Sequence, residues 1–270
     1  IYSIVESMFE LAKKKNVTFH FNTEVEEILI EKNKIVGIKE KNNPNIINYD
    51  IVISNADINY TYQKLIKSKN LKSAEKIKKL EPSSSALVFY WGVKGTYDNL
   101  EIHNILFSDN YEKEFQEIFD EKIIPNDPTI YIYISSKYKK DDAPNGFENW
   151  FVMINAPNNS NFDFKKEIDR IKHKIISKIN EVLKIDLEEK IFFEKILTPE
   201  DIEYETSSYL GSLYGISSNN RKAAFLRQQN KSKEVDGLYF CGGSVHPGGG
   251  IPLTILSGKI TAELIFKYEK

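Results

Sequence analysis

Residues Gly237–Ala262 read GLYFCGGSVHPGGGIPLTILSGKITA, and this stretch indicates the fold. It begins with a short apolar run, Leu238–Cys241, which is typical of a buried strand. Five glycines follow between positions 242 and 250. Pro252 then opens an apolar helical pattern, at a position where its missing N–H has no bond to lose. A strand, a glycine loop and a helix N-terminus in this order let the backbone approach a bound cofactor closely.

Hydrophobic periodicity elsewhere in the chain predicts both helices and strands. Helices are expected over 2–15, 60–80, 111–121 and 164–183, and strands at 17–21, 25–31, 34–40, 50–53, 85–93, 102–107, 129–135, 149–156 and 191–196. Residues 31–34, Glu-Lys-Asn-Lys, separate two of these strands and predict a hairpin. The predicted fold class is α/β, in the α+β sense of a mixed fold that includes an antiparallel sheet.

The two ends of the chain are predicted to form one domain and its middle another. Residues 1–57 and 234–270 have the pattern of a nucleotide-binding domain, and residues 58–233 that of an inserted antiparallel sheet with helices. A complete dinucleotide-binding domain carries a G-x-G-x-x-G turn after its first strand, and this sequence contains none. We therefore expect the chain to be the C-terminal part of a longer protein, with this first unit missing.

Composition excludes several classes of function. A formal net charge of −2 gives no electrostatic basis for binding nucleic acid. Cys241 is the only cysteine, so the chain has neither an internal disulfide nor a cysteine-rich metal site. Motifs for metal ligation or acyl transfer are absent from the sequence, and no metal site is expected.

Several motifs occur in an order known from one family. Residues 237–262 closely resemble the C-terminal FAD-binding signature of bacterial-type phytoene (carotenoid) desaturases, in the amine-oxidase-like flavoprotein superfamily. Thr23-Glu24-Val25 and Ile53-Ser54-Asn55-Ala56-Asp57 are similar to two further steps of that family. So are residues 211–215 and the run 225–230, in which Gln228 replaces the usual proline. The resemblance covers essentially the whole chain.

The resemblance implies FAD as the cofactor and names the residues that contact it. Val25 is implied to place its backbone against the adenine. The glycine loop and the helix start are implied to lie along the flavin and its ribityl chain; these residues are Gly242, Gly243, Ser244, Gly249, Gly250, Ile251 and Pro252. The implied fold is an incomplete Rossmann-like FAD domain (1–57 and 234–270) with an inserted substrate-binding domain (58–233).

The carboxylates and the single histidine near these motifs have structural interpretations. Asp57 and Asp201 are expected to be cap or turn residues, because each stands where a helix begins. His246 is either a base or a loop residue beside the cofactor, and Cys241 is expected to be a small buried hydrophobe. The catalytic residues stay unassigned.

The last helix has two faces that the sequence distinguishes. Leu253, Leu256, Ile260 and Leu264 form an apolar stripe, which we expect to be ordinary core. The second face carries small residues at every fourth position: Thr254, Gly258 and Ala262. A glycine inside a helix costs about 1 kcal/mol relative to alanine. This second face is therefore predicted to pack closely against the missing N-terminal unit.

The family resemblance implies FAD-dependent desaturation of a long apolar carotenoid, such as phytoene or a hydroxylated carotene. Such an enzyme is expected in the cytoplasm, peripherally bound to a membrane surface, and the fragment alone is expected to be inactive. The aromatic strands at 129–135 and 149–156 line an apolar tunnel or form ordinary sheet core. The alternatives are a carotenoid isomerase, a ketolase, an amine oxidase, and a non-catalytic lipid-binding fragment.

Overall fold

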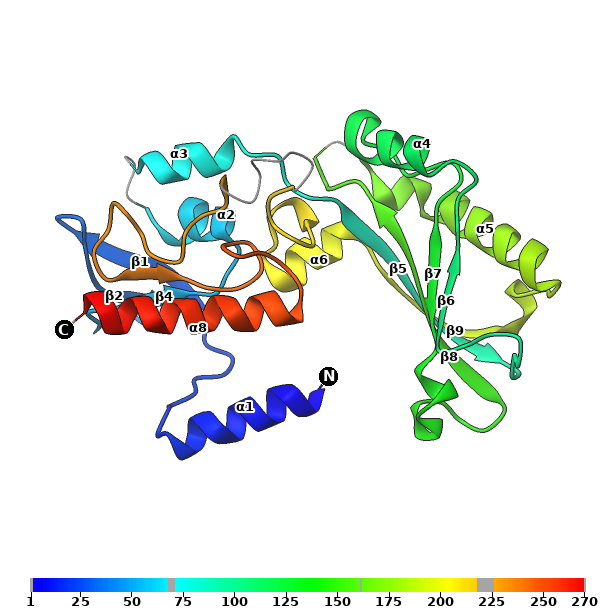
Figure 1. Cartoon of the computed structure of the whole chain (residues 1–270), viewed down its shortest axis with the longest axis horizontal. Helices are drawn as coiled ribbons and strands as arrows, with labels where there is room; N and C mark the ends of the chain where they lie inside the picture. Colours follow the sequence, from blue (N-terminus) through cyan, green and yellow to red (C-terminus); the bar gives the residue numbers. More distant parts are fainter. Residues whose placement is uncertain (1, 68–70, 161, 218–225, 270) are drawn as a thin grey trace.

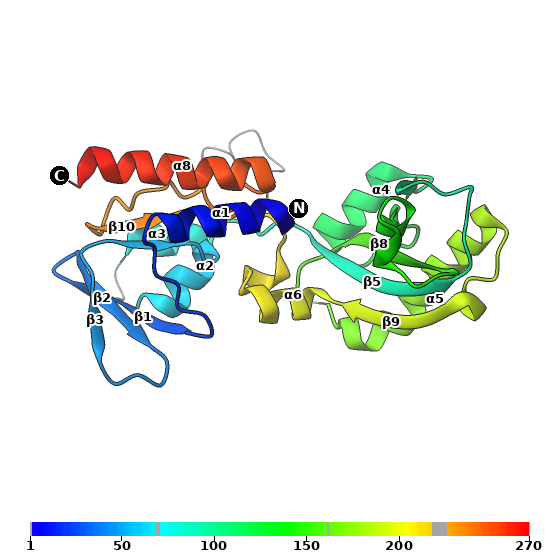
Figure 2. The same cartoon turned by 90° about the horizontal axis from the view of Figure 1, so that it is seen from below.

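The computed structural model describes residues 2–67, 71–160, 162–217 and 226–269. Figure 1 shows two lobes: a terminal lobe built from both ends of the chain and a sheet lobe built from its middle. Figure 2 gives the same arrangement from below, with β5 leading from the terminal lobe into the sheet lobe. Helices and strands mix throughout, so the predicted α/β (α+β) class is confirmed.

The terminal lobe contains two small sheets. One is antiparallel and has the order β1–β2–β3, with β1 at Val25–Glu31, β2 at Lys34–Glu40 and β3 at Ile46–Asn48. The predicted hairpin is confirmed: Lys32 and Asn33 both have positive φ, as a tight two-residue turn requires. In the second sheet, β4 (Val52–Ser54) pairs in parallel with β10 (Leu238–Phe240), which joins the two ends of the chain.

The helices of the terminal lobe are α1 (Tyr2–Lys14), α2 (Ile58–Tyr60), a π-type turn η1 (Thr61–Leu65), α3 (Lys72–Lys78) and α8 (Ile251–Tyr268). Helix α1 forms as predicted, but none of its residues is buried, and Figure 1 shows it apart from the other elements. The strand predicted at 17–21 is wrong, because no strand of the described residues pairs with this segment.

The sheet lobe is a five-stranded antiparallel sheet with the order β6–β7–β8–β5–β9. Its strands are β5 (Ser85–Lys94), β6 (His103–Leu106), β7 (Ile130–Tyr133), β8 (Phe147–Ala156) and β9 (Ile191–Leu197). Its helices are α4 (Tyr111–Gln116), η2 (Glu117–Glu121), η3 (Ser135–Lys137), η4 (Lys140–Asp142), α5 (Phe164–Leu183) and η5 (Glu188–Lys190). Between the two lobes lie α6 (Pro199–Thr206) and η6 (Tyr209–Gly211).

One face of this sheet is covered by α5, which Figure 1 shows lying along it. Strand β8 alternates between buried and half-buried residues over its whole length, as a strand covered on one side does. Trp91, Trp150 and Ile154 of the covered face pack with Ile171 and Ile179 of α5 in one core. The opposite face is left open; we call it the open face.

The second core lies in the terminal lobe. It joins Ile28 and Ile35 to Leu238 and Phe240, and it also contains buried side chains from residues 58–77. The division between the cores therefore does not coincide with the predicted boundary at residue 58. The segment with α2, η1 and α3 packs with β4 and β10.

Helix α6 begins with a capping box formed by Thr198 and Asp201, so Asp201 is a cap residue as expected. The Asp201 N–H donates to Thr198 Oγ1 (3.2 Å), and the Thr198 N–H donates to Asp201 Oδ2 (2.9 Å). Each side chain thus satisfies a backbone N–H that the helix leaves unpaired.

Thr198→Ala is expected to lower the free energy of unfolding by about 1 kcal/mol, because it removes one half of this box. Urea denaturation measures the change. Thr198→Ser keeps the hydroxyl and is the matched control. Equal losses in both variants would contradict the capping role.

Candidate cofactor site

The parallel pair β4 and β10 brings two of the predicted motifs to one edge. The two strands end together at Ser54 and Phe240, and the Cys241 N–H donates to the Ser54 carbonyl (3.0 Å). Residues 55–57 and the glycine loop, residues 242–250, both leave from this edge. In open α/β sheets, ligands bind outside the carboxyl ends of parallel strands.

Three glycines of the loop have left-handed backbone, with φ of +105° at Gly242, +139° at Gly248 and +98° at Gly250. Gly242 and Gly249 also lie against other parts of the chain. A Cβ at Gly242 would collide with the Asn55 side chain, and one at Gly249 would collide with the Tyr214 ring. The loop therefore packs too closely on its neighbours for larger residues.

Gly250 differs from the other loop glycines because a Cβ built there meets no atom within 4 Å. Its positive φ still disfavours a side chain, and the space in front of it is open. Gly250 is also the N-cap of α8. Because glycine has no side chain, no side-chain hydrogen bond caps this helix. The first turn of α8 thus leaves backbone N–H groups available beside open space, which suits an electron-rich ligand.

Asn230 anchors the entry and the middle of the glycine loop. Its side-chain amide is buried, 2.9 Å from Ser257 Oγ and 3.0 Å from the His246 carbonyl oxygen. Ser257 Oγ in turn donates to His246 O (2.8 Å) and accepts from the Gly242 N–H (3.2 Å). One amide and one hydroxyl therefore fix the entry to the loop and its middle.

The buried face of α8 is the polar one. Ser257 and Thr261 are its buried residues, whereas Leu253 and Leu256 are 40% and 42% exposed. The predicted core stripe is therefore wrong at Leu253 and Leu256, whereas Ile260 and Leu264 are half-buried. The reason is local: Thr261 Oγ1 donates to the Phe240 carbonyl (2.7 Å), so the hydroxyl face is the one that packs on β10 and the loop.

Gly258 is surrounded by open space, because an added Cβ meets nothing within 4 Å. The predicted close packing at Gly258 involves no described part of the chain. The contact with a preceding unit stays a prediction.

Arg227 is a residue of this site whose role the sequence did not predict. Its buried guanidinium donates to the carbonyls of Tyr214 (2.9 Å), Ile216 (2.9 Å) and Gly243 (3.3 Å). Burial lowers the pKa of this guanidinium from its ordinary value. Arg227 thereby joins the 211–215 motif to the glycine loop. The run 225–230, which resembles a motif of the family, includes Arg227 and was the sequence feature that could have identified it. Residues 218–225 lie outside the described residues.

The remaining predicted residues lie at distinct places. Ser244 is buried, and its Oγ accepts from the Ile58 N–H (3.0 Å) at the start of α2. Gly243 lies close to Gly249: a Cβ added at Gly243 would be 3.4 Å from the Gly249 Cα. Ile251 and Pro252 are exposed at the start of α8. Val25 begins β1, and the described residues form no hydrogen bond between it and the loop.

Asp57, His246 and Cys241 have structural environments. The Asp57 carboxylate accepts from the Asn59 (2.8 Å) and Tyr60 (3.3 Å) N–H groups, so it caps α2 as expected. Burial raises the pKa of Asp57. His246 uses its backbone to hold the loop, through bonds to Gln228, Asn230 and Ser257. Cys241 is half-buried, and burial raises the pKa of its thiol.

A cavity of about 320 Å³ lies directly beside the loop. Its lining includes Tyr214, Arg227, Pro247, Gly249 and Leu253. Within the described ranges, no three His, Cys, Asp or Glu side chains are grouped to hold a metal ion. In the same ranges, no helix is both long and apolar enough to cross a membrane.

Comparison with known proteins decides the family. Residues 2–266 match the family described as flavin containing amine oxidoreductase. The chain belongs to that family. The resemblance to carotenoid desaturases is confirmed as well: the chain is 49% identical over 265 residues to the 1-hydroxycarotenoid 3,4-desaturase of Flavobacterium sp. (strain P99-3). That alignment covers 98% of this chain and 54% of the relative.

Two further proteins are similar over the same extent. A 4,4'-diaponeurosporene oxygenase of Staphylococcus aureus (strain bovine RF122 / ET3-1) is 33% identical, with 98% of this chain and 53% of that protein covered. An oxidoreductase from Methanosarcina mazei of known structure has a TM-score of 0.62 at 14% identity, and shares the fold over 98% of this chain and 53% of its own. The chain thus spans about half the length of these relatives.

Membership of this family implies a flavin, and the glycine-loop edge fits one. The fit rests on the open space at Gly250, the uncapped N-terminus of α8, and the loop that Asn230 and Arg227 hold in place. A flavin ring carries carbonyl oxygens and, when reduced, negative charge, both of which a helix N-terminus favours.

Proposed function

We propose that this chain is the C-terminal part of an FAD-dependent carotenoid desaturase. The observation that carries the proposal is the glycine loop with open space at Gly250, in a chain 49% identical to a carotenoid desaturase. FAD, rather than another flavin, is proposed because the adenine step Thr23-Glu24-Val25 accompanies the loop. We propose that a preceding unit supplies the pyrophosphate turn, and that this chain alone therefore binds FAD poorly.

The chemistry divides between the cofactor and this chain. When bound, a flavin would supply the acceptor for the hydride that leaves one substrate carbon, while the neighbouring carbon loses a proton. The residues of this chain position the reacting parts and exclude water: Gly250 leaves the space, the start of α8 supplies N–H groups, and Arg227 holds the loop rigid. Asp57 caps a helix, so we assign it no proton transfer. Catalysis by positioning needs no dedicated acid–base pair.

The open face of the sheet lobe supplies the apolar surface that a long polyene requires. A groove of about 630 Å³ runs over it and is lined mostly by aromatic rings. The sheet-core interpretation of 129–135 holds for alternate residues, and for the others the lining of a tunnel stays a proposal. Ile130 and Ile132 are fully buried in the core under α5, whereas Tyr131 and Tyr133 lie half-buried on the open face. The rings present flat apolar surface to an extended substrate.

The membrane is the proposed source of this substrate. A long apolar carotenoid resides in a bilayer, so we propose a cytoplasmic enzyme bound peripherally to the membrane surface. The exposed side chains of Leu253, Ile255 and Leu256, beside the glycine loop, support this placement.

Expression of the intact protein in a bacterium that makes acyclic carotenes and their hydroxylated derivatives tests the function. We expect the pigment to absorb at longer wavelength, because each added double bond extends the conjugated system. The parent bacterium is the control. Unchanged acyclic and hydroxylated carotenes would contradict the proposal.

Oxygenation of the carotenoid is a second candidate, favoured by the 33% identity to a carotenoid oxygenase. Mass spectrometry of the same pigments separates the two. A desaturase product loses two hydrogens, whereas an oxygenase product gains oxygen.

A further inference from the structure

The open face carries a continuous strip of rings from the centre of the sheet to its edge. Tyr90 on β5 contacts Phe151 on β8 edge-on (ring centroids 5.5 Å apart), and Phe151 contacts Tyr131 on β7 in the same way (6.2 Å). Tyr133 pairs with Phe151 across the strands and also lines the apolar groove. The strip crosses β5, β8 and β7 and ends at the edge strand β6.

The end of the strip is polar. His103 on β6 stacks on Tyr133 (5.1 Å) and on Tyr131 (6.1 Å), and its Nδ1 is 2.8 Å from the Tyr131 hydroxyl. We call these three residues the edge cluster. In the part of the chain that the structure describes, His103 Nε2 and the Tyr133 hydroxyl form no hydrogen bond. Both groups lie at the surface of the open face, where a bound molecule can reach them.

We propose that the edge cluster binds a hydroxyl group at one end of the polyene substrate. This inference rests on the proposed function, because it names the substrate class for the same open face. From β5 to β6 the strip crosses three interstrand spacings, about 14 Å. An extended polyene lying across the strands therefore contacts aromatic rings first and reaches His103 with its end.

The chemistry of the cluster suits a hydroxyl group better than a hydrocarbon end. A hydroxyl both donates and accepts, as do an imidazole and a phenol. Placing a substrate hydroxyl on an apolar face without a partner is unfavourable, so the cluster compensates for that cost. A hydrocarbon end gains nothing from His103, and covering the cluster with it removes water from polar atoms. The edge cluster thus favours a hydroxylated carotene over an unhydroxylated one.

The test compares two substrates on the intact protein with its flavin. We measure kcat/KM for an acyclic carotene with a terminal hydroxyl and for the same carotene without it, in Tyr131→Phe and His103→Leu variants. Tyr131→Phe keeps the ring and removes only the hydroxyl. We expect the preference for the hydroxylated substrate to fall about 5- to 10-fold in each variant. Tyr138→Phe, which removes an exposed hydroxyl outside the cluster, is expected to leave the preference unchanged.

The outcomes separate this inference from the proposed function. If both substrates slow equally in the variants, the His103–Tyr131 bond only stabilises the edge strand, and the inference is overturned. Equal kcat/KM for the two substrates in the unaltered protein would also overturn it while leaving desaturation intact. If the unaltered protein converts neither carotene, the proposed function itself fails.

Discussion

Gly250→Val in the intact protein is expected to weaken FAD binding at least about tenfold. Two effects add. The φ of +98° at Gly250 strains a branched residue, and the new side chain enters the open space where we place the cofactor. A change of 1.4 kcal/mol is already tenfold in a dissociation constant. Visible flavin absorbance per protein, followed by titration with FAD, measures the effect.

Gly146→Val is the matched control, which separates the effect of backbone strain from that of blocking the cofactor's space. Gly146 also has a positive φ, +80°, and open space around an added Cβ, but it lies in the turn before β8. We expect it to lose stability and to keep its flavin. Normal flavin content and turnover in Gly250→Val would show that the glycine loop is only a connector.

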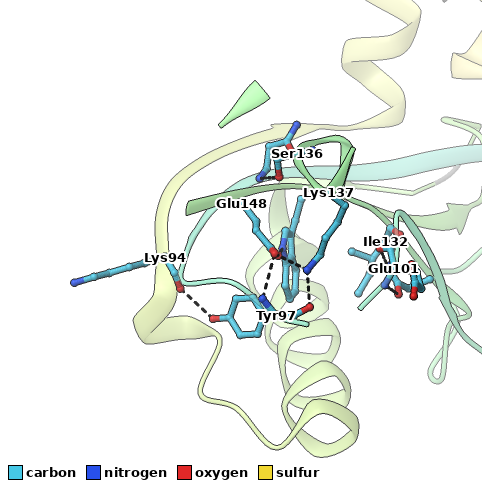
Figure 3. Close-up of polar contacts among 10 residues, drawn as sticks. Lys94, Tyr97, Glu101, Ile132, Ser136, Lys137 and Glu148 are labelled. Carbon is cyan, nitrogen blue, oxygen red and sulfur yellow. Dashed lines mark hydrogen bonds and ion pairs between the residues drawn. The ribbon is translucent and has the colours of Figure 1, made fainter. Parts of the chain in front are cut away.

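Glu148→Ala is expected to lower the free energy of unfolding of the sheet lobe by about 3–5 kcal/mol. Figure 3 shows its carboxylate between Lys137 and Tyr97. Lys137 Nζ is 2.7 Å from Glu148 Oε1, and the Tyr97 N–H donates to the same oxygen (3.1 Å). Trp150 Nε1 donates to Oε2 (2.9 Å). Only 5% of the Glu148 side chain and 17% of the Lys137 side chain are exposed, so alanine leaves a half-buried ammonium without its counter-charge.

Urea denaturation followed by tryptophan fluorescence measures this loss, because both tryptophans, Trp91 and Trp150, lie in this core. Asp141→Ala is the matched control: it removes one carboxylate of an exposed ion pair with Lys139 in the same lobe. We expect no measurable change there, since exposed pairs contribute little. A Glu148→Ala midpoint equal to that of the control would contradict the role of the buried pair.

Local periodicity was enough to predict most of the elements. Strands β1 and β2 and helix α5 have the predicted bounds, because each has a clear repeat and a turn or cap at its ends. Strand β3 was missed, since Ile46–Asn48 is short and follows a polar stretch. The strand expected at 17–21 has the right composition, but a strand also needs a neighbour, and sequence pattern does not supply one.

The part of the candidate site that lies within one sequence motif could be predicted. The contacts between residues far apart in the sequence could not. The glycine loop could be predicted because five glycines and two prolines lie within residues 242–252. The network of Arg227, Asn230 and Ser257 could not, because it depends on which carbonyls the fold leaves unpaired. The same cause explains the buried face of α8. Hydroxyl groups that bond such carbonyls, as Thr261 does, outweighed the leucine stripe that the period favoured.

Anaerobic mixing of the intact flavoprotein with a hydroxylated acyclic carotene tests the central claim most directly. The absorbance of the flavin and that of the polyene are followed in the same sample. We predict that the flavin bleaches while the polyene shifts to longer wavelength, in equal amounts. A polyene that stays unchanged while a soluble amine bleaches the flavin would contradict the account and identify an amine oxidase.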